Sequence, residues 1–137
     1  MRLKPMLIAV AVVSTLAPAK QPSYTGTWAW GSIKGGGGTL KVIDLGGLLR
    51  FDLECYRGAP SHNIGNISGD VIIENGVGTF KPDDPSVSCE IKFTLKKTII
   101  VLERLGNGDC DFGYAVFPDG QYRRKSSKRP KLEDPSA

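Results

Sequence analysis

Serine, histidine and aspartate side chains, the residue types of a nucleophile–base–acid triad, occur together in the middle of the sequence. His62 precedes Ser68 by six residues, and several aspartates are available to orient the histidine. The string at 65–69, Gly-Asn-Ile-Ser-Gly, lacks the Gly-x-Ser-x-Gly spacing of a nucleophile elbow, and it precedes an expected strand instead of a helix. A single histidine beside Asn63 in a polar loop is typical of a solvated surface residue. We therefore expect no catalytic residues.

Acidic pairs and cysteines are the other groups with possible chemistry. Asp83–Asp84 and Asp109/Asp111 could serve glycoside hydrolysis or calcium binding, but solvated loops explain them better, and nothing resembles a twelve-residue calcium loop. The three cysteines include no Cys-x-x-Cys pair, and His62 lies elsewhere in the sequence. The sequence thus predicts neither a metal site nor a cofactor.

A glycine-rich run at 31–38 raises the question of phosphate binding. Phosphate-binding glycine loops lead into a helix, whereas this run leads into Thr-Leu-Lys-Val at 39–42, a strand pattern. We interpret it as a hairpin loop that forms a mobile lip at one end of the fold, a common place for partner contact. Lys34 and Gly36 are candidate contact residues there, together with His62.

The elements that must position these residues are strands. Apolar and polar residues alternate at 49–55 and 87–95, the period of a half-buried strand, and β-branched or aromatic residues mark further candidates. Turn pairs such as Asn75–Gly76 separate them, and helical periodicity is absent. The remaining expected strands are 24–30, 40–45, 71–74, 78–81, 98–103, 110–116 and 121–123. The sequence predicts an all-β fold: a small antiparallel meander of about eight strands, closed into a barrel or a barrel-like sandwich.

Aromatic residues bear on whether such a barrel is hollow. Trp28 and Trp30 share one face of the first strand, so Trp28 would plug the core while Trp30, beside the glycine loop, could line a pocket near the mouth. Tyr114 is a further candidate for a pocket or a partner contact. The bulky residues expected to face inward leave little room for a ligand: Leu49, Phe51, Leu53, Ile91, Phe93, Phe112 and Tyr114.

The odd number of cysteines predicts one disulfide and one unpaired thiol in an oxidising compartment. We favour Cys89–Cys110, because both lie near strand starts separated by one hairpin and hence at the same end of the sheet. These strands are not adjacent in a strict meander, so a bulge or a closing turn must bring the cysteines together. Cys55 is then a small buried hydrophobic residue.

The two ends of the chain differ from its middle. Arg2 and Lys4, the apolar run 6–16 and Ala-Pro-Ala at 17–19 form a secretory signal peptide, so we expect a domain at 20–123 that acts outside the cytoplasm. Residues 20–122 carry ten basic and twelve acidic groups, which excludes the basic stripe of a nucleic-acid binder. No second apolar run is long enough to span a membrane. Residues 124–137 are expected to be a disordered tail, and the basic residues of this end are Arg123, Arg124, Lys125, Lys128, Arg129 and Lys131.

Several short motifs together carry a resemblance. Gly-Thr-Trp at 26–28 is similar to the opening of calycin barrels, the lipocalins and avidins. Over residues 24–123 the chain resembles a family of small secreted bacterial β-proteins without an assigned function. The matching positions are Gly26, Thr27, Trp28, His62, Gly65, Ile67, Ser68, Gly69, Cys89, Phe93, Cys110, Phe112, Gly113, Asp119, Gly120 and Tyr122. Asp111 stands where that pattern has glycine, and His62 is one residue further from Gly65 than in the pattern. The resemblance supports the Cys89–Cys110 pairing and a bacterial, extracytoplasmic setting, and it implies no activity.

These observations favour a non-enzymatic binding protein. Its loops or barrel mouth would engage another macromolecule, for example as an inhibitor or immunity protein against a cell-envelope hydrolase. A small-ligand carrier of the calycin type is the alternative if the interior is hollow, and a small hydrolase ranks third. The basic tail could hold the protein near an anionic partner in the envelope or could simply increase solubility.

Overall fold

The computed structural model describes residues 1–14 and 23–133, and all regular secondary structure within these ranges is β. Residues 1–14 are exposed and form neither helix nor strand, and the predicted cleavage site at 17–19 lies outside the described residues. No helix in the described ranges is long and apolar enough to cross a membrane. The strands are β1 (Gly26–Ser32), β2 (Gly36–Asp44), β3 (Leu48–Tyr56), β4 (Ile64–Ile72), β5 (Val77–Phe80), β6 (Ile91–Leu95), β7 (Ile99–Arg104) and β8 (Gly120–Ser126).

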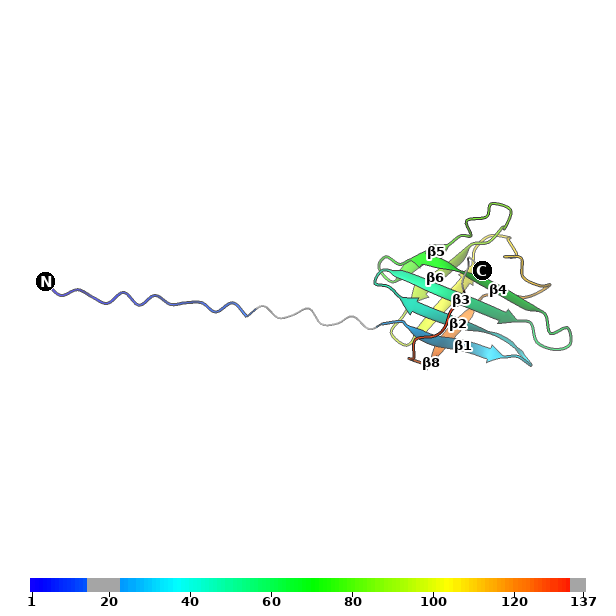
Figure 1. Ribbon diagram of the computed structural model, residues 1–137, viewed down its shortest axis with the longest axis horizontal. Coiled ribbons are helices and arrows are strands. Elements are labelled where there is room, and N and C mark those ends of the chain that lie inside the picture. Colours follow the sequence, from blue (N-terminus) through cyan, green and yellow to red (C-terminus); the bar gives the residue numbers. More distant parts are fainter. Residues whose placement is uncertain (15–22, 134–137) are drawn as a thin grey trace.

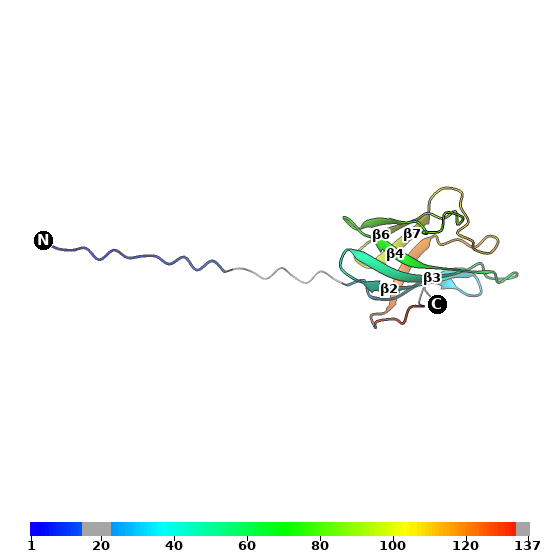
Figure 2. The ribbon, with the colours of Figure 1, turned by 45° about the horizontal axis from the view of Figure 1, so that its top comes forward.

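The strands form one antiparallel sheet in the order β4-β3-β2-β1-β8-β7-β6-β5. Because β8 returns to pair with β1, the meander wraps around a single core, as Figures 1 and 2 show. An isolated bridge between Glu74 and Val77 closes the turn that connects β4 to β5, and no ladder joins these two strands among the described residues. The predicted all-β meander is confirmed as a barrel that is nearly closed, with a gap between β4 and β5 that we call the seam.

Alternation along the strands fills the barrel interior. On β3 every second residue is buried and the residues between face outward at least in part. Phe51 packs against Phe80 and Phe93, with ring centroids 5.0 and 4.9 Å away. Burial of each such side chain contributes about 1.5–3 kcal/mol. The largest fully buried side chains are Trp28, Tyr122, Phe51, Phe93, Leu40, Leu49, Leu53, Ile91, Ile100, Leu102, Val42 and Val71.

The string at 65–69 is part of β4, whereas the sequence predicted that it precedes a strand at 71–74. Gly65 and Gly69 occupy inward positions of β4, where the missing side chains leave room for two aromatic rings. A Cβ on Gly65 would overlap the ring of Phe112, and one on Gly69 would overlap the ring of Phe80. The two glycines therefore serve packing: they seat the rings that fill the barrel beside the seam.

The predicted strand over 110–116 is wrong. Residues 105–119 form one long loop between β7 and β8, in which Cys110, Asp111 and Ala115 have positive φ angles of 59°, 55° and 57°. These left-handed residues break the extended backbone, so the loop folds over the end of the barrel. Phe112 is buried as expected, but Tyr114 is 79% exposed and does not face inward.

The disulfide between Cys89 and Cys110 is confirmed, with Cα atoms 4.3 Å apart. It joins the segment before β6 to the long β7–β8 loop, and the Cys110 N–H donates to the Ser88 carbonyl (3.0 Å). The loop thus supplies the closing turn that brings the cysteines together. A bridge over a sequence separation of 21 contributes about 3 kcal/mol on the chain-entropy model.

The predicted boundary between domain and tail at 123/124 is too early, because β8 continues to Ser126. The Arg124 guanidinium donates to the carbonyls of Thr25 (2.7 Å) and Ser23 (2.8 Å) and lies 4.3 Å from the Trp28 ring. Residues 127–133 form no regular structure and return along the outside of the sheet, where Glu133 N–H donates to Asp52 Oδ2 (2.6 Å). The start of the basic tail is therefore structural.

Candidate binding surfaces

Three loops converge at one end of the barrel and bring most of the predicted contact residues together. We call this surface the loop face; it comprises residues 33–35, 57–64 and 105–119. Ala59 N–H donates to the carbonyl of Lys34 (2.9 Å), which joins the first two loops. Asn63 Nδ2 donates to the carbonyl of Tyr114 (3.1 Å), which joins the second loop to the third. The hairpin-loop interpretation of the glycine run also holds, since its turn lies at 33–35.

Exposed apolar side chains distinguish the loop face. Ile33 and Ile64 are more than half exposed, and Tyr114 and Phe117 project from the long loop. Each aromatic ring is paired with an arginine. The guanidinium carbon of Arg57 lies 5.1 Å from the centre of the Tyr114 ring, and that of Arg104, at the end of β7, lies 4.8 Å from the centre of the Phe117 ring. Aromatic and arginine side chains are enriched at protein interfaces and among their hot spots.

Backbone contacts hold this surface in place. His62 has a φ of 51° and donates its N–H to the carbonyl of Gly58 (2.9 Å), which closes the second loop. Gly36 has a φ of 93°, and a Cβ there would lie 2.9 Å from the Arg57 carbonyl oxygen. Gly36 is therefore needed for close loop packing, while Lys34 and His62 present exposed side chains. With Phe112 anchored beneath Gly65, a partner would meet preformed loops, which lowers the entropic cost of binding.

Ser68 and His62 do not assemble into a catalytic pair. Ser68 lies in the middle of β4, and His62 lies in the loop before that strand begins at Ile64. Four residues of extended strand already separate Ile64 from Ser68 by about 13 Å. A proton transfer needs the two side chains within hydrogen-bond reach.

Trp30 does not line a mouth as the sequence suggested. Its ring packs edge-on against Tyr122, with centroids 6.5 Å apart, and Nε1 is buried without a hydrogen-bond partner among the described residues. A Cβ on Gly120 would lie 2.5 Å from that nitrogen, so the strand presses directly on the indole. Trp30 is therefore partly buried and packs against the core.

The free thiol is also an interior group. Cys55 is fully buried on β3, and its Sγ lies 3.9 Å from the Tyr122 hydroxyl, which donates to the Pro118 carbonyl (2.8 Å). Burial raises the pKa of Cys55 to about 12, so the thiolate does not form near neutral pH. Desolvation likewise raises the pKa of Tyr122. These groups stabilise the core as neutral side chains.

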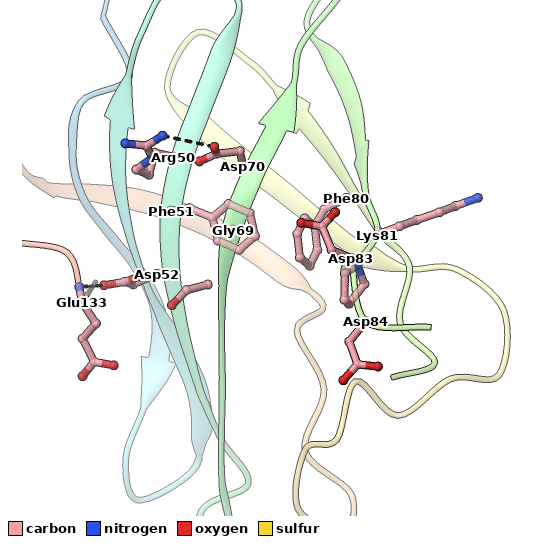
Figure 3. A pocket seen from close by; sticks show the side chains of 12 residues that line it. Arg50, Phe51, Asp52, Gly69, Asp70, Phe80, Lys81, Asp83, Asp84 and Glu133 are labelled. Atoms are coloured by element: carbon pink, nitrogen blue, oxygen red, sulfur yellow. Dashed lines mark hydrogen bonds and ion pairs between the residues drawn. The ribbon is translucent and has the colours of Figure 1, made fainter. Parts of the chain in front are cut away.

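A groove of about 560 Å³ runs along the outside of the seam (Figure 3). Its floor is formed by Phe51, Gly69 and Phe80, and charged side chains stand around it. We call it the seam groove; it is lined by Arg50, Phe51, Asp52, Ser68, Gly69, Asp70, Phe80, Lys81, Pro82, Asp83, Asp84 and Glu133.

The charge of the seam groove is mainly negative. Arg50 is bound in a fork by Asp70, with Nε and Nη2 at 2.9 and 3.2 Å from the carboxylate oxygens. Lys81 reaches out to Glu90 at 3.7 Å. Hydrogen bonds from the Ser86 hydroxyl and N–H lower the pKa of Asp84 and keep it ionised. Asp52, Asp83, Asp84 and Glu133 form no close ion pair in the described chain. Lys41 of β2 lies opposite Asp52, so the carboxylates at 83–84 are the ones that a cation would find without a neighbouring positive charge.

Sequence reasoning did not find the seam groove. The sequence predicts loop solvation for Asp83–Asp84, and its pattern does not show that the outward residues of β3 and β4 form one polar row. The register places Arg50 opposite Asp70 and Asp52 opposite Ser68. These outward polar residues of β3 and β4 lie side by side only because β4 begins at Ile64, well before the strand that the sequence predicted at 71–74.

A further groove of about 530 Å³ lies at the opposite end of the barrel. Its apolar lining includes Tyr24, Leu49, Ile73 and Leu95, close to the turns that join β2 to β3 and β4 to β5. It is an external hollow next to a filled interior, so it offers a small ligand less burial than a calycin cavity would.

The chain was compared with protein-family models, with curated proteins and with solved structures, and no match was found in any of the three. The binding surfaces described above therefore rest on the geometry of this chain alone.

Proposed function

We propose that the protein is a non-enzymatic binding protein of the cell exterior or periplasm that inhibits or neutralises a cell-envelope hydrolase through its loop face. The observation that carries this proposal is the pairing of exposed rings with arginines on loops that a barrel and a disulfide hold in place. Tyr114 over Arg57 is the clearest pair. A firm, protruding surface of this kind suits insertion into an active-site cleft, because little order must be gained on binding.

The secreted setting is part of the proposal. A disulfide in a small β-barrel is compatible with an oxidising compartment, and the N-terminal sequence predicts export. Envelope hydrolases occur in the same compartment, so a small exported domain would meet them there.

The proposal is tested by adding the purified mature domain to a panel of cell-wall hydrolases and following the clearing of a cell-wall suspension. We expect inhibition of at least one enzyme, and we expect Tyr114→Ala with Phe117→Ala to weaken it about thirtyfold, as for an interface hot spot. Leu45→Ala, which removes an apolar side chain 51% exposed at the other end of the barrel, is the matched control. Inhibition that is insensitive to the loop variant but reduced by the control would contradict the assignment of the loop face.

A small-ligand carrier is the second candidate, and the groove at the opposite end, which combines apolar side chains such as Leu49 and Leu95 with polar groups, favours it. Native mass spectrometry of the protein purified from its own host would detect a retained small molecule. A bound ligand that Leu95→Gln releases, with hydrolase inhibition absent, would support the carrier over the inhibitor.

A further inference from the structure

The seam leaves one edge of β4 without a neighbouring strand. In an antiparallel pair, hydrogen-bonding residues alternate with residues whose backbone groups point the other way. Arg57 N–H donates to Asn63 O (3.0 Å) and Ile73 N–H donates to Gly47 O (2.9 Å), so the odd-numbered residues of β4 bond to β3. The even-numbered residues of β4 therefore point their N–H and C=O groups into the seam, and Asn66, Ser68 and Asp70 form the middle of this row.

No backbone hydrogen bond within residues 23–133 reaches these three peptide groups from the other side of the seam. β5 pairs only with β6 in this part of the fold, and the chain then turns away through residues 81–84, which form the opposite wall of the seam groove. Figure 3 shows Gly69 of β4 facing Phe80 and Asp83 across this groove. An open strand edge of this kind is a template for another strand.

The charges of the groove select the occupant. A second copy of β4 would bring Asp70 and the carboxylates at 83–84 of two molecules together, and like charges disfavour that pairing. A segment bearing lysine or arginine would instead meet carboxylates on both walls. We propose that an extended, basic peptide segment of a partner protein adds to β4 as a strand in the seam groove.

The dimensions and floor of the groove fit such a segment. A volume of about 560 Å³ accommodates a short stretch of extended chain. The floor is closed, because the Phe80 ring fills the space beside Gly69, so an added strand would lie on it with alternate side chains in reach of the carboxylates that line the groove. Main-chain hydrogen bonds would supply affinity, and the carboxylates would supply the preference for basic sequences.

The test uses a synthetic peptide in which lysine and valine alternate, with binding to the whole mature protein measured by fluorescence anisotropy. Two control peptides separate the contributions: one replaces every lysine by glutamate, and one carries N-methyl groups on alternate backbone nitrogens. We expect binding of the lysine peptide that weakens with salt, and little binding of either control. Equal binding of the N-methylated peptide would overturn strand addition.

Protein variants test the same edge. Ser68→Pro removes an N–H that faces the seam and leaves the ladder to β3 intact, so the protein should fold while peptide affinity falls about fivefold or more. Ser68→Ala keeps the N–H and should bind normally. Asp83→Asn with Asp84→Asn should weaken binding up to about fivefold for each carboxylate, whereas the matched pair Asp109→Asn with Asp111→Asn, which does not line the groove, should not.

This inference is independent of the loop face, and its failure is recognisable by itself. Tyr114→Ala should leave peptide affinity unchanged. Absence of binding by the lysine peptide at low salt, or an affinity unaffected by Ser68→Pro, would mean that the carboxylates serve only to keep other strands away from the edge.

Discussion

Replacing Gly69 by alanine tests how the seam is filled. A Cβ at this position would overlap one edge carbon of the Phe80 ring and lie 2.9 Å from Cζ, where ordinary contact begins at 3.4 Å. The ring is 5% exposed and packs against Phe51, so it has little space to retreat. Overpacking of this kind costs about 1–3 kcal/mol, which lowers the melting temperature by roughly 4–12 °C for a domain of this size.

The assay is urea unfolding followed by tryptophan fluorescence, with the free energy of unfolding compared between variants. Gly35→Ala is the matched control, because its Cβ would meet only the Ser32 hydroxyl at 3.5 Å and its φ is not positive. A second control combines Gly69→Ala with Phe80→Leu, a smaller side chain. The alanine should then cost at least about 1 kcal/mol less than it does beside the native ring. If Gly69→Ala destabilises no more than Gly35→Ala, the ring does not depend on the glycine and the packing argument is wrong.

Three further predictions concern the closure of the barrel and its cysteines. Arg124→Ala should destabilise the protein by about 2 kcal/mol in thermal unfolding. The change removes two hydrogen bonds to the carbonyls of Ser23 and Thr25 and the contact with the Trp28 ring. Arg123→Ala, at an exposed position, is the control and should change stability little. Replacing Cys89 and Cys110 by serine should cost about 3 kcal/mol in urea unfolding, and an unchanged midpoint would show that the bridge does not constrain the unfolded chain. Burial raises the pKa of Cys55 from 9.0 to about 12, so the thiol of the unfolded chain loses its proton at a lower pH than the thiol of the folded protein. The contribution of the neutral Cys55 thiol to stability should be complete below about pH 9 and should decrease as the pH rises toward 12. The free energy of unfolding of Cys55→Ala should decrease less over the same pH range.

The sequence predicted the strands whose two faces differ. On β3 and β6, alternation marks the buried face directly, so Phe51 and Phe93 were placed correctly. The cysteine pairing was also predicted correctly, although the reason lay in the folding of the long loop. The burial of Cys55 follows from its place in the alternation of β3, where it shares the inward face with Phe51 and Leu53.

Three features were not readable because tertiary contacts determine them. β4 carries glycine at two inward positions, where apolar side chains would normally mark a strand, and the rings of Phe112 and Phe80 fill the space instead. The sequence of β4 therefore resembles that of a loop. Residues 110–116 alternate like a strand, yet three residues adopt positive φ, and Tyr114 turns outward. Arg124 resembles part of a solvated tail, but its guanidinium binds the segment before β1. Each case depends on a partner distant in the sequence.

The candidate contact residues were predicted in part. Lys34, His62 and Tyr114 come together on the loop face. Gly36 begins β2 beneath this face and acts through packing, and Trp30 is partly buried against the core. The sequence could place loops at one end of a meander, because alternate hairpins must lie at the same end. It could not show that Phe112 anchors the third loop beneath Gly65.

Recognition by the loop face is tested most directly by a photoreactive amino acid placed at position 114 in the protein within its native envelope. The same group at position 45, at the opposite end of the barrel, is the comparison. The account predicts a discrete protein adduct from position 114 and none from position 45. Adducts of equal yield from both positions, or none from position 114, would contradict it.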